Sequence, residues 1–222
     1  MKRSEINNHM KEAKVFFDKM NIKLPAWAAW SPGQWKGKYS VCSEIAENMM
    51  GWDLTDFGSG HFSKRGLILF TVRNGNIKKD KKSYCEKIMI AGEHQETPMH
   101  FHWKKMEDII NRGGGNLVME LYHSGNDGKF SDTAFKIKID GVIQDMKPGA
   151  KVTITPGESI CLEQGIYHRF WGENGKVMVG EVSTVNDDAT DNRFYEEIGR
   201  FPEIVEDEEP LYLLVSDYKK YF

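Results

Sequence analysis

The stretch TPMHFHWKKMED, residues 97–108, decides the fold of this chain. In an extended strand, residues i and i+2 point to the same face, so the imidazoles of His100 and His102 would lie next to each other. The carboxylate of Glu107 can fold back from the loop that follows and act as a third ligand. Such a donor set binds metal ions and leaves positions open for a small oxygen-bearing molecule. The stretch therefore predicts a strand that carries a metal site.

Two histidines in this spacing do not identify a metal site by themselves. The chain contains 7 histidines, so the pair could also be an exposed pH-sensitive pair or a coincidence. A further candidate ligand lies far downstream, at His168 in the segment GIYH, residues 165–168. This second histidine segment makes the metal site the better interpretation.

The two segments together resemble the paired motifs of the cupin superfamily. The first motif is usually Gly-x5-His-x-His-x3,4-Glu-x6-Gly. Here the two histidines, Glu107 and Gly114 fit, while Gly92 stands two residues too far upstream. The resemblance implies a mainly β protein with a cupin-type antiparallel β-barrel, or jelly roll.

The second cupin motif is usually Gly-x5-Pro-x-Gly-x2-His-x3-Asn. Gly157, Gly165 and His168 keep its spacing, but Glu163 replaces the proline and Gly172 stands where asparagine is expected. The resemblance is thus clear at the histidine and weaker around it.

Length and composition indicate one domain. A chain of 222 residues can bury a full core, and we expect a single cupin domain over residues 1–222. The formal net charge of -3 and the pI near 6.2 give no overall reason to bind nucleic acid or an anionic membrane. The basic run at residues 78–82 is expected to be a solvated loop.

Nothing in the sequence indicates secretion or a membrane span. The N-terminus lacks an apolar segment, and no stretch approaches the roughly 18 apolar residues that cross a bilayer. Cys42, Cys85 and Cys161 are odd in number and lack CxxC spacing, which is typical of free thiols in a reducing cytoplasm. We expect a cytoplasmic protein.

The first third of the chain is predicted to be helical and the remainder rich in strands. Apolar residues recur at steps of three and four over residues 4–20, where Ser4 could cap a helix and Asn21 could end it. Residues 1–60 are expected to form a helical and aromatic-rich extension packed on the barrel. Strands are predicted over residues 66–73, 83–91, 116–123, 134–139, 142–144, 151–155 and 176–185, with turns at residues 111–116 and 172–175. This pattern favours an antiparallel sandwich or barrel.

Three tryptophans lie close together in the segment PAWAAWSPGQW, residues 25–35. Their indoles could line a sugar site by stacking. The alternative, which we favour, is a packed elbow between the helix and the barrel or a contact with another subunit.

Longer strings resemble one family, the D-lyxose isomerases, which are cupin sugar ketol-isomerases. These strings are residues 100–115, 185–188 and 190–194, and the similarity extends over nearly the whole chain. The resemblance implies a manganese-dependent interconversion of D-lyxose and D-xylulose, often with D-mannose and D-fructose as a second pair, in a homodimeric cytoplasmic enzyme. It also implies the metal ligands His100, His102, Glu107 and His168.

The donor set alone does not select one metal. Neutral imidazoles with a carboxylate suit Mn²⁺, Fe²⁺, Co²⁺, Ni²⁺ or Zn²⁺, and the lack of thiolates disfavours a structural zinc site. Such a centre can polarise a carbonyl and stabilise a developing enediolate.

Isomerisation also needs a base that moves a proton between two carbons. Alternation along residues 176–185 places Glu181 on one face of a strand, either inward near the metal or outward to water. Glu181 and Glu120 are the candidate carboxylates, with Lys87 or Lys105 as polar partners. Arg193 could bind sugar hydroxyls or pair with neighbouring aspartates.

Two other functions stay open as alternatives, and only the first uses a similar centre. One is an iron-dependent cupin dioxygenase, which would consume oxygen. The other is a non-catalytic cupin that binds a sugar.

Overall fold

The computed structural model describes residues 1–79, 81–185, 187 and 190–222. Parts of two sequence segments considered above, the basic run at 78–82 and the string at 185–188, therefore lie outside the described residues, at Asp80, Asn186 and Asp188. The helices are α1 (Arg3–Lys19), the 3-10 helix η1 (Ala26–Ala29), α2 (Pro32–Trp35), α3 (Tyr39–Glu47) and α4 (Tyr218–Tyr221). Among the described residues, no helix combines the length and apolar character needed to cross a bilayer.

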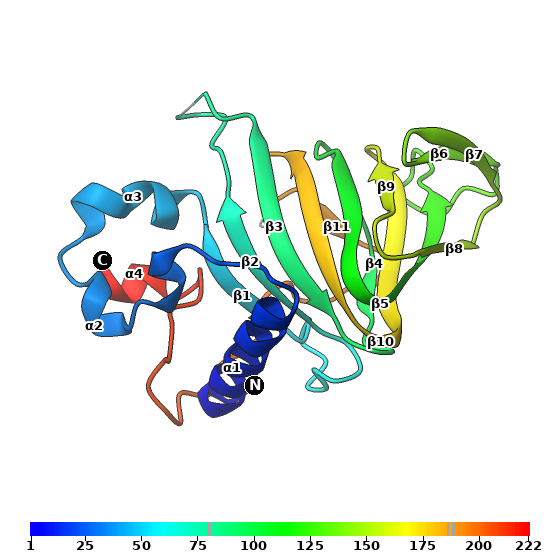
Figure 1. The fold of residues 1–222 in the computed structure, drawn as a ribbon. Helices are drawn as coiled ribbons and strands as arrows, with labels where there is room; N and C mark the ends of the chain where they lie inside the picture. The colour runs from blue at the N-terminus through cyan, green and yellow to red at the C-terminus, as the bar shows by residue number, and fades with distance from the viewer. Residues whose placement is uncertain (80, 186, 188–189) are drawn as a thin grey trace.

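The other regular elements are antiparallel strands (Figure 1). They are β1 (Gly51–Thr55), β2 (Leu67–Arg73), β3 (Tyr84–Ala91), β4 (Thr97–His102), β5 (Glu107–His123), β6 (Phe135–Ile139), β7 (Val142–Met146), β8 (Ala150–Ile154), β9 (Ser159–Leu162), β10 (Ile166–Thr184) and β11 (Asn192–Phe194). The predicted mainly β, cupin-type fold with a helical N-terminal part is confirmed.

Two long strands, β5 and β10, fold the sheet over on itself. The second half of β10 pairs with β3 and with the first half of β5, so that Glu181 lies opposite Lys87 and Ile109. The first half of β10 pairs with β4 and with the second half of β5. One side of the barrel therefore has the order β1-β2-β3-β10-β5-β9-β6-β7, while β11, β4 and β8 extend the other side.

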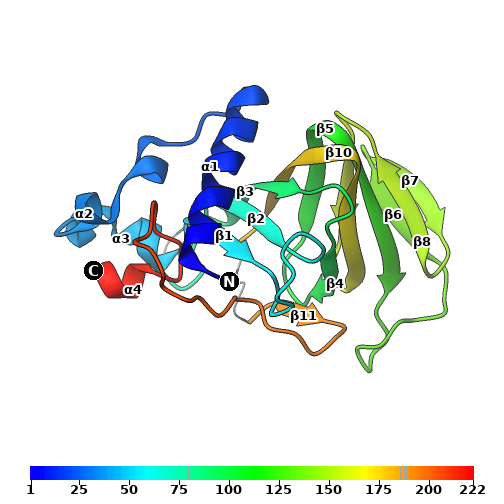
Figure 2. The same ribbon diagram turned by 90° about the horizontal axis from the view of Figure 1, so that it is seen from below.

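The main core lies between these two sides. Its buried residues include Leu69 of β2, Met89 of β3, Ile109 of β5 and Val179 of β10. A second apolar cluster lies outside the barrel, where α1 packs against β1, β2 and β3 (Figure 2). The helix periodicity predicted from sequence produces this contact, because Ile6, Met10, Ala13 and Phe17 are all buried.

The start of α1 differs from the prediction. Ser4 does not cap the helix, because the N-cap residue is Lys2. The hydroxyl of Ser4 instead donates a hydrogen bond of 2.8 Å to Asp207, near the C-terminal end of the chain. The predicted end of the helix agrees better, since Asn21 has a φ of 58°, which stops the helical path.

Two predicted turns are wrong, because they lie inside long strands. Residues 111–116 belong to β5, and residues 172–175 belong to β10. The glycines in these segments allow β5 and β10 to approach each other closely. Gly114 has a φ of 96°, and a Cβ at this position would collide with the backbone oxygen of Lys176.

The tryptophan-rich segment forms a packed elbow. Trp35 is buried and lies with its ring centroid 6.3 Å from that of Trp27 and 5.0 Å from that of Trp30. Tyr218 of α4 contacts the same indole, with centroids 5.3 Å apart. This cluster joins the N-terminal part to the C-terminal end and does not line the histidine pocket described below.

Candidate metal centre and pocket

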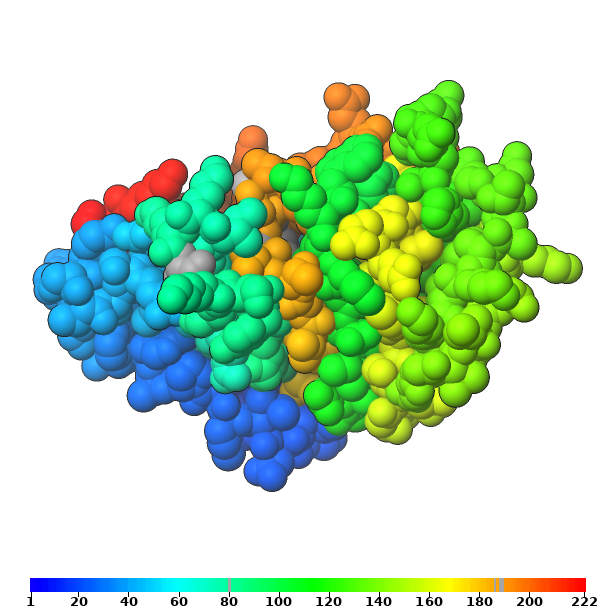
Figure 3. All heavy atoms as spheres, turned by 90° about the horizontal axis from the view of Figure 1, so that it is seen from above, coloured from blue at the N-terminus to red at the C-terminus, as the bar shows by residue number. Residues whose placement is uncertain are grey.

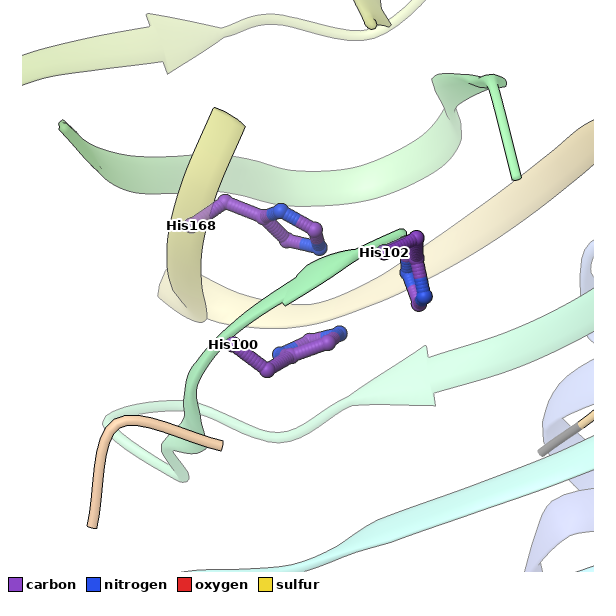
Figure 4. A group of neighbouring side chains, drawn as sticks. All are labelled: His100, His102 and His168. Carbon is purple, nitrogen blue, oxygen red and sulfur yellow. The ribbon is translucent and has the colours of Figure 1, made fainter. Parts of the chain in front are cut away.

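Three histidines converge inside the barrel (Figure 4). His100 and His102 project from the same face of β4, and His168 projects from β10 directly opposite His100. One ring nitrogen from each histidine can be chosen so that all lie within 4.8 Å of one another. The predicted spacing rule and the antiparallel register together account for this cluster.

Backbone carbonyls orient two of the imidazoles. Nδ1 of His100 lies 2.7 Å from the carbonyl oxygen of Pro98, and Nδ1 of His168 lies 3.0 Å from that of Ile166. A carbonyl oxygen only accepts hydrogen bonds, so Nδ1 carries the proton in each ring. The other nitrogen, Nε2, then has a free lone pair, which is the tautomer that a metal ligand needs.

The imidazoles of His100 and His168 are electrically neutral near neutral pH. Burial lowers the pKa of His168 to about 4, although the charge of Glu107 opposes this shift. Burial, helped by the charges of His168 and His102, lowers the pKa of His100 well below its usual value. Neutral imidazoles are the form that binds metal ions.

Glu107 lies beside these rings. Its Oε1 atom is 3.1 Å from Nε2 of His102 and 3.3 Å from Nε2 of His168. Within the described part of the chain, Oε1 of Glu107 and Nε2 of His102 are buried and have no hydrogen-bond partner. Neighbouring ligands of one ion, each about 2.1 Å from it, would be separated by about 3 Å. The three histidines therefore fit a metal ion by position, and Glu107 lies at ligand-to-ligand distance from two of them.

A buried lysine connects this centre to a second carboxylate. Nζ of Lys105 lies 2.6 Å from Oε2 of Glu107 and 3.0 Å from Oε1 of Glu181. Nζ of Lys87 lies 3.5 Å from the same oxygen of Glu181, and the hydroxyl of Ser183 donates a 3.0 Å hydrogen bond to it. The structure thus places Glu181 inward, as one of the two orientations considered from sequence.

These charges set the ionisation of Glu107. Burial alone raises the pKa of a carboxyl group. Lys105 and His102 outweigh that effect and hold the pKa of Glu107 well below its usual value. Glu107 is therefore ionised at neutral pH and ready to bind a cation.

The pocket is lined by both polar and apolar residues. The polar lining includes Lys87, Lys105 and Glu181 together with the histidines and Glu107. The apolar lining consists of Phe57, Leu67, Leu69, Met89, Ile109, Phe170 and Phe194. Figure 3 views the molecule from above, where the teal, orange and green segments lie side by side, in the order that β3, β10 and β5 have in the sheet. This arrangement suits a small polar molecule with a carbon skeleton.

Three polar lining residues were not among the predicted site residues, namely Thr97, Asn192 and Arg200. Asn192 on β11 pairs with His102 on β4, so both side chains point the same way. Arg200 follows β11 and forms a 2.6 Å ion pair with the buried Asp53 of β1. Only the strand register of the short β11 could have revealed Asn192, and no local signal marks Arg200.

Two predicted site residues lie elsewhere. Glu120 accepts a 2.7 Å hydrogen bond from Arg169 and does not line the pocket, because Arg169 and His168 point to opposite faces of β10. Arg193 is exposed, and its guanidinium donates a 2.8 Å hydrogen bond to the carbonyl oxygen of Phe194. The geometry does not support the expected catalytic role of Glu120 or the sugar-binding role of Arg193.

Comparison with known proteins shows which family this chain is similar to. The family model described as D-lyxose isomerase matches residues 1–218. A D-lyxose/D-mannose isomerase from Serratia proteamaculans is 46% identical over 226 residues, which cover 100% of this chain and 99% of that protein. One of the same description from Escherichia coli O157:H7 is 44% identical, with 100% of both chains covered.

Solved structures of sugar isomerases share the fold. The L-ribose isomerase of Cellulomonas parahominis superposes with a TM-score of 0.59 at 12% identity, covering 91% of this chain and 98% of that one. The L-ribose isomerase of Acinetobacter sp. DL28, bound to L-ribose, gives a TM-score of 0.59 at 14% identity, with the same coverage. At this identity the likeness concerns the fold alone.

Proposed function

The chain belongs to the D-lyxose isomerase family, and we propose that it is a metal-dependent aldose–ketose isomerase that interconverts D-lyxose and D-xylulose. D-Mannose and D-fructose are the second proposed pair, because both curated relatives are described as D-lyxose/D-mannose isomerases. The observation that carries this proposal is the buried Lys105–Glu181 pair beside the histidine cluster.

The reaction requires two proton movements and no outside reagent. A proton leaves C2 of the aldose and returns to C1, while another passes from the hydroxyl at C2 to the former carbonyl oxygen at C1. We assign the first movement to Glu181, which lines the pocket. Lys105 and Ser183 contact its Oε1 atom and hold the carboxylate in place.

His100, His102, Glu107 and His168 would hold the metal, for which the family resemblance implies Mn²⁺ and the donor set also suits Co²⁺, Fe²⁺, Ni²⁺ or Zn²⁺. When bound, the ion supplies Lewis acidity that polarises the carbonyl of the sugar. Glu107 also contacts Lys105, so the charge of one lysine influences both the ligand and the proposed base.

The lysines favour the negative charge that develops on the sugar. Removing a proton from C2 produces an enediolate, and a cationic side chain nearby lowers its energy most when water is excluded. Lys87 and Lys105 are each 3% exposed. We assign to Lys105 the transfer of the proton between the oxygens at C2 and C1, or the stabilisation of the negative charge on them. Lys87 would hold Glu181 in place through their 3.5 Å contact.

The remaining assignments follow from the family and the composition. We propose that residues 1–222 form a single cupin domain with residues 1–60 as its packed extension, and that the enzyme is a homodimer in the cytoplasm. Among the described residues, Cys42, Cys85 and Cys161 are not joined by disulfide bonds, which agrees with a reducing compartment.

The deciding experiment uses metal-stripped protein, D-lyxose and added Mn²⁺, with chromatography of the sugars and an oxygen electrode. We expect D-xylulose to form only with the metal, without oxygen consumption, and the His168→Ala variant to be inactive. Oxygen consumption that requires iron would instead indicate the dioxygenase. Sugar binding without conversion of lyxose or mannose under any metal would indicate the non-catalytic protein.

A further inference from the structure

Asp191 holds the turn that connects β4 to β5. Its Oδ1 accepts a 2.9 Å hydrogen bond from the backbone N–H of Lys104, and its Oδ2 accepts one of 2.9 Å from that of Lys105. Its backbone carbonyl accepts a third, of 3.2 Å, from the N–H of Trp103. One residue therefore binds three consecutive amides, and this residue is 6% exposed.

Pocket residues lie in this turn and directly on both sides of it. It follows His102, contains Lys105 and precedes Glu107. Trp103 and Lys104 are exposed, whereas Lys105 is 3% exposed and points inward. The inward direction of Lys105 depends on the path of its own backbone, and that path depends on the amides that Asp191 binds.

Other contacts anchor the turn at different atoms. Gln164 donates a 2.9 Å hydrogen bond to the carbonyl oxygen of Lys104, and Thr184 contacts Met106 through a backbone bond of 3.0 Å. These contacts satisfy carbonyl groups or the far end of the turn. The amides of Lys104 and Lys105 are bound by Asp191, and charged acceptors form the stronger kind of hydrogen bond.

We propose that Asp191 is a positioning residue that sets Lys105 between Glu107 and Glu181, without contacting the sugar itself. Asp191 immediately precedes Asn192, which lines the pocket from β11, so it also ties that strand to the turn. The effect on catalysis rests on the proposed isomerase function, whereas the effect on the position of Lys105 does not.

The first test measures the position of Lys105 without using activity. Wild type, Asp191→Ala and Asp191→Asn, each loaded with Mn²⁺, are treated with an amine-reactive acetylating ester, and each lysine is quantified by mass spectrometry. We expect Lys105 to be protected in the wild type and labelled at least about 10-fold faster in Asp191→Ala. Lys87, equally buried but on β3, should stay protected and so shows that the variant is folded.

The second test separates positioning from binding. Moving a catalytic group by about 1 Å costs roughly 10²-fold in rate, so kcat should fall by about 10- to 100-fold in Asp191→Ala while KM changes less than about 3-fold. Asp191→Asn keeps one acceptor oxygen, so its kcat should lie between those of the wild type and Asp191→Ala. Asp127→Asn is the matched control, because Asp127 accepts a 3.1 Å bond from the backbone N–H of Lys129 in an exposed loop.

The outcomes distinguish the two proposals. If Lys105 stays as protected as Lys87 in Asp191→Ala, or if Lys87 loses its protection in both variants, the positioning role is wrong. A kcat unchanged within about twofold in an active enzyme also overturns it. If Lys105 is released but the wild type converts no sugar, the positioning role stands and the proposed isomerase function fails.

Discussion

Lys105 and Glu181 form a buried ion pair with an Nζ–Oε1 distance of 3.0 Å, although 76 positions separate them in sequence. Lys105 lies in the turn before β5, and Glu181 lies on β10, which pairs with β5. The same Nζ is 2.6 Å from Glu107. The pair thus links the side chain proposed as a metal ligand to the one proposed as the base, and most predictions below concern this link.

Replacing Glu181 by glutamine removes the proposed base but keeps its size. We expect kcat for D-lyxose to fall by roughly 10²- to 10⁴-fold, because general-base catalysis contributes about that much. The variant should still bind Mn²⁺, since Glu181 is not a proposed ligand. Steady-state kinetics and the metal content of the purified variant check both statements.

Glu120→Gln is the matched control for that variant. Glu120 is a buried carboxylate paired with Arg169, outside the pocket. Its replacement should leave kcat within about threefold of the wild type. A large loss in Glu120→Gln with normal activity in Glu181→Gln would reverse the assignment.

Metal binding should stabilise the folded protein independently of activity. Four donors are held together in the folded state, so an ion that binds only this state raises stability, by about 2.7 kcal/mol at a concentration of 100 Kd. We expect a chelator to lower Tm and Mn²⁺ to restore it. His168→Ala should lose this Mn²⁺-dependent shift, and its persistence there would place the ion elsewhere.

Sequence reasoning predicted the histidine cluster because local rules determine it. The i, i+2 alternation of β4 brings His100 and His102 together, and the motif spacing identified His168. It could not choose between Glu181 and Glu120, since both occupy strands whose inner and outer faces depend on long-range pairing. The register of β10 against β3 and β5 decides this point, with Glu181 opposite Lys87.

The wrong turns at 111–116 and 172–175 have the same origin. Glycine-rich segments usually mark turns, but here β5 and β10 approach closely enough that side chains would collide. The roles of Asp191 and Arg200 were not predicted from the sequence for a related reason. Their partners are residues 103–105 and Asp53, which lie far away in the chain.

A second buried ion pair should determine much of the stability at the ends of the chain. Arg3 is fully buried and contacts both carboxylate oxygens of Asp217 at 2.9 Å. Arg3→Met would leave the carboxylate of Asp217 buried without that partner, so we expect the free energy of unfolding to fall by about 3–5 kcal/mol. Denaturant unfolding followed by circular dichroism measures this loss.

The exposed pair between Lys23 and Asp18 provides the comparison for Arg3. Their Nζ–Oδ1 distance is 2.7 Å, but the side chains are 70% and 62% exposed. Lys23→Met should therefore leave the free energy of unfolding almost unchanged. Equal effects of the two replacements would contradict a special role for burial at Arg3.

The ion pairs of Arg3 also predict how the stability of the protein depends on pH. The hydrogen bond from Arg3 lowers the pKa of Glu206 from 4.5 to about 2, with Lys220 adding to the shift. A carboxyl group whose pKa is lower in the folded state stabilises that state fully above pH 4.5, and the contribution disappears as pH falls toward 2. Tm of the wild type should exceed that of Glu206→Gln at pH 7, and the gap should close between pH 4.5 and 2. Glu203→Gln, which changes an exposed carboxylate on the same segment, is the control for the loss of one negative charge. A gap for Glu206→Gln that stays constant over this range would mean that the ionised form of Glu206 does not contribute.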